Sequence, residues 1–260
     1  FIIAAYSRPS SGGSGGTTSP DQTGEEKDKT PDDPPVESLV PISGGTQELP
    51  VTVETSANAA NVKPLEEMEL QQITEAAEAT GKSVAIDLSS IDDMIDTAVI
   101  PSGLLTGVAQ SATLGLEITM PDGKNVNFDK TALAALTAAG SDDLKLGVRN
   151  VPADTLTASE RRLVGNATVI DLTAYVGEKQ VNDFGGGQVT VNIPVSGQPV
   201  EHPIVWRMVT DAEGNVSLEA IECTYNPETN SYQFRTGTFS KYVISNYPFT
   251  DTPNSSWYYE

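Results

Sequence analysis

The chain has 260 residues, enough for one large domain or two small ones, and 38% of them are hydrophobic. Its 36 acidic residues against 15 basic ones give a formal net charge of −21, which disfavours binding to nucleic-acid phosphates and to anionic lipid headgroups. The single cysteine, Cys223, excludes an internal disulfide, and no stretch is apolar for the roughly 18 residues that a membrane helix needs.

The first 47 residues do not have the composition of a folded domain. Residues 1–6 are apolar but lack the basic region of a signal peptide, and we expect them to be the last strand of a preceding domain. Residues 7–47 contain a Gly/Ser run, then charges and prolines, with no aromatic residue. Such a segment buries too little apolar surface to offset the entropy of ordering it, so we predict a disordered or extended linker over residues 7–47.

Residues 48–163 are predicted to be an α+β region in which short helices cover a sheet. Pro64 suits the first turn of a helix that Gly81 ends, and Asp129 suits the N-cap of a later helix. The helix–strand units repeat too irregularly for a solenoid. Helices are predicted at 64–81, 101–109 and 131–139, and strands at 49–54, 84–88, 114–120 and 144–148.

Residues 164–247 carry short strands of alternating polarity, which predict an antiparallel β-sheet or sandwich. A short helix should precede them, with Thr157 as its cap and Glu160 completing a capping box. Strands are predicted at 169–175, 189–194, 204–209, 216–225, 232–236 and 239–245. The predicted fold class is therefore α+β, with helices over a sheet in the first half and antiparallel β-structure in the second.

Two motifs resemble catalytic elements but have simpler structural interpretations. Asp183-Phe184-Gly185 spells the magnesium motif of protein kinases, yet the strand lysine and the His-Arg-Asp loop are absent. We expect glycines 185–187 to supply positive φ angles or a bulge. His202, the one histidine, lies in a predicted turn without a recognisable Ser or Cys partner, so we expect no catalytic role.

Acidic pairs are abundant, and counting alone leaves a glycosidase pair open. Asp92-Asp93 and Asp142-Asp143 fall in predicted loops, where acidic residues are favoured by turn chemistry. The run 211–215 lacks the spacing of an EF-hand and predicts a hairpin turn. We predict no catalytic, cofactor-binding or metal-binding site.

Five aromatic residues recur in the predicted strands: Trp206, Tyr225, Phe234, Phe239 and Tyr242. If exposed together they would form a platform for carbohydrate, whereas burial would make them the core of a sheet. We expect core packing, because aromatic residues are enriched in strands for packing alone.

The last residues resemble the opening of an S-layer homology module. Phe249 and Asp251 precede a proline turn, and Trp257 stands where a first helix should begin. Asp251 and Trp257 match the Asp and Trp of that signature, so residues 248–260 are identified as the start of such a module. The second half of the chain is similar to the stalk that precedes these modules in surface proteins of clostridia and related Firmicutes. That similarity covers residues 181–194, 205–206, 223–225 and 234–244 in order.

The resemblance implies a non-catalytic stalk or spacer of a secreted bacterial protein, located outside the cell at the cell wall or S-layer. In the family, three complete repeats bind a pyruvylated secondary cell-wall polysaccharide. Residues 248–260 lack the later Thr-Arg-(Ala/Gly)-Glu motif, so we do not expect the fragment alone to bind the wall. The alternative is an adhesin or carbohydrate-binding module whose β-rich half contacts a host or glycan ligand, and an enzyme accessory domain is a third hypothesis.

Overall fold

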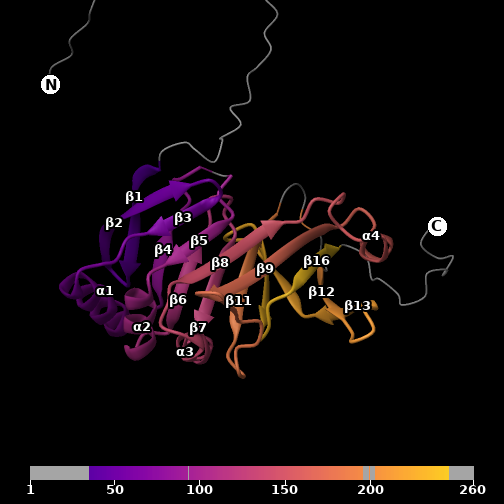
Figure 1. The fold of residues 1–260 in the computed structure, drawn as a ribbon. Coiled ribbons are helices and arrows are strands. Elements are labelled where there is room, and N and C mark those ends of the chain that lie inside the picture. Colours follow the sequence, from indigo (N-terminus) through magenta and orange to yellow (C-terminus); the bar gives the residue numbers. More distant parts are fainter. Residues whose placement is uncertain (1–34, 93, 196–198, 200–202, 246–260) are drawn as a thin grey trace, which may run out of the picture.

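The computed structural model describes residues 35–92, 94–195, 199 and 203–245, which form one large sheet with four helices (Figure 1). The helices are α1 (Glu67–Thr80), α2 (Ser102–Gln110), α3 (Lys130–Ala139) and α4 (Ala158–Val164). The strands are β1 (Val36–Gly44), β2 (Gln47–Ser56), β3 (Ala59–Val62), β4 (Val84–Asp87), β5 (Thr97–Ile100), β6 (Gly115–Thr119), β7 (Asn125–Asp129), β8 (Leu144–Asn150), β9 (Thr168–Val176), β10 (Lys179–Gln180), β11 (Val189–Pro194), β12 (Ile204–Thr210), β13 (Val216–Ile221), β14 (Cys223–Asn226), β15 (Ser231–Thr236) and β16 (Lys241–Ser245).

The sheet returns almost to its own beginning. Neighbouring strands follow the order β13-β12-β16-β9-β8-β5-β3-β2-β1-β4-β6-β7-β11-β15-β14, and β10 pairs with β9. All pairs are antiparallel except β3 with β5 and β4 with β6. The two ends of this order, β13 and β14, are consecutive along the chain and separated only by Glu222. The sheet is therefore nearly closed, with a seam between β13 and β14.

A mixed fold, mostly strand with a few short helices, is confirmed. The expected division into two halves is not reflected in the sheet, because strands from both sides of residue 164 pair with each other. β7 pairs with β11 and β8 pairs with β9. These long-range pairs join the regions 48–163 and 164–247 into one sheet.

The predicted linker over residues 7–47 is wrong for its last part, since β1 lies within it. Val40 and Ile42 of β1 are buried in the core, but Pro41 between them hides the alternation in the sequence. Pro41 stands opposite Pro50 of β2, and the ladders to the outer neighbours, β4 and β3, start beyond both prolines. Neither proline therefore removes a ladder hydrogen bond to those strands. Residues 1–34 and 248–260 lie outside the described residues.

The main core fills the inner face of the sheet and is shared with three helices. Ile86, Phe128 and Val191 point inward from β4, β7 and β11, and each is fully buried. Ile73 of α1 and Leu133 of α3 belong to the same cluster, as do residues of α2. The helices α1, α2 and α3 therefore cover the inner side of the sheet, in the indigo-to-magenta part of Figure 1.

A second, smaller apolar cluster lies under α4. Val164 of α4 packs with Val169 of β9, Met208 of β12 and Val243 of β16. These strand residues are on the opposite face from the main core, so α4 covers the outer side of the orange-to-yellow part of the sheet (Figure 1). Lys241 Nζ lies 2.6 Å from Glu160 Oε1 and ties α4 to β16.

The loop before β11 packs directly onto the start of α3. The Asp129 carboxylate accepts from the amide N–H of Ala132 at 2.7 Å, which caps α3, and from that of Gln188 at 2.9 Å. A Cβ on Gly187 would lie 2.2 Å from the Ala132 nitrogen, so this close approach needs glycine. The two preceding glycines have φ angles of 61° and 89°, which confirms the positive φ expected for this run.

Candidate functional site

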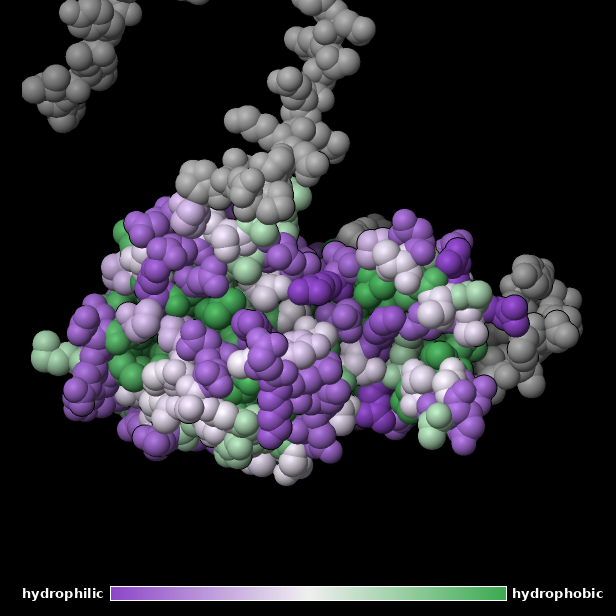
Figure 2. All heavy atoms as spheres, in the orientation of Figure 1, coloured by the Kyte–Doolittle hydropathy of each residue, from purple (hydrophilic) through white to green (hydrophobic). Residues whose placement is uncertain are grey.

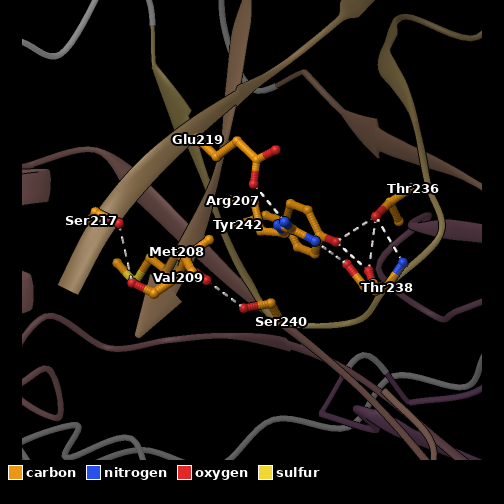
Figure 3. A network of polar contacts seen from close by, with 9 residues as sticks. All are labelled: Arg207, Met208, Val209, Ser217, Glu219, Thr236, Thr238, Ser240 and Tyr242. Atoms are coloured by element: carbon orange, nitrogen blue, oxygen red, sulfur yellow. Dashed lines mark hydrogen bonds and ion pairs between the residues drawn. The ribbon is translucent and has the colours of Figure 1, made fainter. Parts of the chain in front are cut away.

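A cluster of polar side chains lies beside the seam of the sheet (Figure 3). Arg207 comes from β12, Glu219 from β13 and Tyr242 from β16, while Thr236 ends β15 and Thr238 follows it. We call these five residues the seam cluster. They bring together β12 and β13, at one end of the strand order, and β15, next to the other end.

Arg207 links two sides of the seam cluster. Its Nη2 lies 2.5 Å from Glu219 Oε2, directly across the β12–β13 ladder. Its Nη1 donates to Thr238 Oγ1 at 2.5 Å. Glu219 is more than half exposed, whereas the Arg207 side chain is mostly buried. The buried Arg207 Nε has no hydrogen-bond partner within the described part of the chain.

Tyr242 anchors the other half of the seam cluster. Its fully buried hydroxyl lies 2.8 Å from Thr236 Oγ1 and donates to the Thr238 carbonyl. Burial raises the pKa of Tyr242, and the hydrogen bonds and the Arg207 charge offset this only in part. The phenol therefore stays protonated at neutral pH, so it serves as a hydrogen-bond donor and not as a base.

The seam cluster is suited to holding strands together. A nucleophilic site needs a nucleophile activated by an adjacent base, and the cluster contains neither a histidine nor a cysteine. Its hydrogen bonds instead join strands that have no backbone ladder between them. We conclude that its side chains replace, at the seam, part of the bonding that a ladder supplies elsewhere.

The motif Asp183-Phe184-Gly185 forms a structural turn. Asp183 Oδ1 accepts from the Gly185 amide at 2.9 Å, inside the turn itself. Phe184 is fully buried, with its ring centroid 4.8 Å from Phe239 and 5.8 Å from Phe128, both nearly perpendicular to it. The motif thus contributes an aromatic cluster to the core.

The acidic pairs also satisfy backbone groups. Asp143 Oδ1 accepts from the amide of Ser102 at 2.9 Å, at the start of α2, and Asp92 Oδ1 accepts from that of Met94 at 3.0 Å. Asp93 lies outside the described residues. No group of three His, Cys, Asp or Glu side chains positioned for a metal occurs among the residues with a described position.

The predicted hairpin turn at 211–215 is confirmed between β12 and β13. Asp211 Oδ1 accepts from the amides of Glu213 and Asn215, and its Oδ2 accepts from the Asn215 side chain at 2.9 Å. The hydrogen bonds from Asn215 are the main reason that the pKa of Asp211 is lowered. The carboxylate is therefore used by the turn.

The aromatic residues mostly pack in the interior. Phe234, Phe239 and Tyr242 are at most 5% exposed, which confirms core packing for these three. Trp206 and Tyr225 are half-buried, and Trp206 lies against the small cluster under α4. Figure 2 shows hydrophobic residues as separate green areas among hydrophilic ones. These five aromatics therefore do not make a common exposed platform.

The remaining predicted residues divide into one that is described and three that are not. Asp251, Trp257 and His202 lie outside the described residues. Cys223 is half-buried, and burial raises the pKa of its thiol to about 11. A thiol with that pKa is almost entirely protonated at neutral pH and is a poor nucleophile.

The seam cluster was not predicted from the sequence, although one part of it was accessible. Counting back from the turn at 211–215 pairs Arg207 with Glu219. Thr236, Thr238 and Tyr242 join them only because the sheet nearly closes, which no local pattern indicates.

Comparisons with known proteins add no relative. The chain matches no protein-family model, and no curated protein matches it. Within the described part, no helix has the length and apolar character to span a membrane. Function must therefore be argued from the contacts within the chain itself and from the resemblance of its sequence to known stalks.

Proposed function

We propose that this chain is a non-catalytic stalk or spacer of a bacterial cell-surface protein that is anchored to the cell wall through C-terminal S-layer homology modules. One observation carries the proposal. The first and last described strands, β1 and β16, are each hydrogen-bonded along both edges within the same sheet. A spacer must transmit force between its ends, and strands paired on both sides resist being peeled away.

The pairing of these two strands is extensive. Every residue of β1, from Val36 to Gly44, pairs with β2, and its last three residues also pair with β4. β16 pairs with β12 on one side and with β9 on the other. A pull along the chain at either end therefore acts on an internal strand, and the seam cluster stabilises the one break in the sheet.

The same side chains support a non-enzymatic role. The Tyr242 phenol is held protonated, the Cys223 thiol has a raised pKa, and Asp211 is bonded within its own turn. Each reactive group named here is thus engaged or protected by the fold. Broad screening of the chain against glycosidic, ester and peptide substrates should give no turnover. A turnover that disappears when one carboxylate is replaced would contradict the proposal.

The location of the proposed protein rests on the resemblance of residues 248–260 to an S-layer homology module. We propose an extracellular position at the cell wall or S-layer, with the secondary cell-wall polysaccharide as partner of the complete modules. No nucleic-acid partner and no membrane insertion are part of the proposal, in keeping with the charge of −21.

Co-sedimentation tests the anchoring. The chain extended through three complete repeats should pellet with purified pyruvylated cell-wall polymer, and the 260-residue chain should stay in the supernatant. Trp257→Ala in the extended chain should reduce pelleting, and mild acid removal of pyruvate from the polymer should abolish it. If the extended chain folds but ignores the polymer, or the 260-residue chain already binds it, the anchoring proposal fails.

A further inference from the structure

Two rows of polar side chains cross the outer face of the sheet over β6, β7, β11 and β15. In the first row, Asn192 stands opposite Asn125 on one side and Gln233 on the other. In the second, Thr190 stands opposite Asn127, which in turn stands opposite Glu117. We call the six residues Asn125, Asn127, Asn192, Gln233, Thr190 and Glu117 the amide face.

The side chains of the first row form a hydrogen-bonded chain with one direction. Gln233 Nε2 donates to Asn192 Oδ1 at 2.8 Å, and Asn192 Nδ2 donates to Asn125 Oδ1 at 3.1 Å. Asn125 Nδ2 then donates to Glu117 Oε1 at 2.8 Å. Each amide nitrogen has a second N–H, and each amide oxygen a second lone pair. The chain thus fixes the amide orientations and leaves donors and acceptors for a ligand.

The helices leave the amide face open. Val126, Val191 and Phe234 alternate with it along the same strands and point into the main core, where α1, α2 and α3 also pack. The helix on the outer side, α4, contacts the cluster on β9, β12 and β16 instead. Within the described part, no helix packs on this side of β6, β7, β11 and β15. At a strand spacing of ~4.8 Å, the face is about 14 Å wide across these four strands.

The charge of the amide face differs from that of the whole chain. Glu117 is its one acidic residue, and Arg235 stands beside Thr190 on the same side of β15. The local charge is therefore close to zero in a chain with a net charge of −21. Electrostatic complementarity favours an uncharged ligand here, because the acidic remainder of the surface repels polyanions.

We infer that the amide face binds a neutral glycan chain laid across β6, β7, β11 and β15. Neighbouring hydroxyls of a sugar pair with the adjacent donor and acceptor of an amide. A polymer running across the strands meets one polar side chain of the first row on each strand. This inference goes beyond the proposed spacer role, which stands whether or not the glycan binds. It also differs from the sequence-based adhesin hypothesis, because half of the face comes from β6 and β7.

Affinity electrophoresis tests the inference with defined polymers. The chain is run in native gels containing mannan, xylan or mixed-linkage β-glucan, and in a gel containing polygalacturonate as the polyanion. We expect retardation by at least one neutral polymer and none by polygalacturonate. Asn192→Ala should weaken that binding roughly tenfold, because it removes one or two hydrogen bonds to the ligand and interrupts the amide chain.

Two further variants make the result specific. Asn61→Ala is the matched control, since Asn61 lies in the same sheet on β3, is also half-buried and donates to the Glu54 carbonyl at 3.1 Å. It should leave binding unchanged. Thr190→Val keeps the shape of the face and should weaken binding several-fold, which covers the case in which Asn192→Ala unfolds in circular dichroism. The inference is overturned by no retardation in any neutral polymer, by equal losses in Asn61→Ala and Asn192→Ala or Thr190→Val, or by binding to polygalacturonate alone.

Discussion

Replacing Tyr242 by phenylalanine removes a single buried oxygen from the seam cluster. The ring stays in place, with its centroid 5.0 Å from that of Phe234, so core packing is retained. The hydroxyl lost in Tyr242→Phe is the one that bonds to Thr236 Oγ1 and to the Thr238 carbonyl. The variant therefore isolates the hydrogen bonding of the seam cluster from the apolar packing beneath it.

The expected cost follows from the two hydrogen bonds. A typical intramolecular hydrogen bond contributes about 0.5–1.5 kcal/mol net, so Tyr242→Phe should lower the free energy of unfolding by about 1–3 kcal/mol. In a chain of this size each kcal/mol shifts the melting temperature by about 2–4 °C. A loss of ~2 kcal/mol thus predicts a melting temperature roughly 4–8 °C lower.

Urea unfolding followed by circular dichroism measures this cost, and Tyr225→Phe is the matched control. The Tyr225 hydroxyl lies 2.9 Å from Asn230 Oδ1 at an exposed position, so its removal should change the free energy of unfolding by less than ~0.5 kcal/mol. If the two variants lose the same stability, the seam cluster does not stabilise the closure of the sheet.

Phe239→Ala should lower the free energy of unfolding by about 3–5 kcal/mol in urea unfolding, since the side chain is 5% exposed; a loss under ~1 kcal/mol would contradict its place in the core. Gly187→Ala should cost about 1–3 kcal/mol because the new methyl group meets backbone, while Gly103→Ala in α2, where nothing lies within 4 Å, should be neutral or stabilise by up to ~1 kcal/mol; equal melting temperatures would refute the close approach. Burial would raise the pKa of Glu160, but hydrogen bonds, first that from Lys241, outweigh it and lower the pKa below its ordinary value of 4.5. The contribution of Glu160 is therefore present above pH 4.5 and is lost as the pH falls through the folded-state pKa, and Lys241→Met should flatten this part of the stability–pH curve; an unchanged acid limb would argue against the ion pair.

Local signals in the sequence predicted the helix ends well. Asp129 caps α3, and Thr157 with Glu160 forms the capping box of α4, as expected. Gly81 has a φ of 60° after α1, although the helix begins at Glu67 and not at Pro64. Such caps depend on residues within one turn of each other, so a short window of sequence contains the information.

Non-local pairing was beyond the sequence. Val126 of β7 and Val191 of β11 are direct neighbours in the sheet although more than sixty residues separate them. Each strand shows the same alternation whichever strand lies beside it, so the division at residue 164 could not be tested by pattern alone. The seam cluster and the amide face both depend on this pairing, which explains why neither was predicted.

Single-molecule stretching tests the central claim, that the described strands form one force-bearing unit. The chain is held at its two ends and extended at constant speed until it unfolds. The account predicts one main rupture that releases about 210 residues between Val36 and Ser245, or roughly 70–75 nm of contour length before subtraction of the folded end-to-end distance. Two separate ruptures of about half that length, at forces no higher than those of a helical domain in the same instrument, would contradict it.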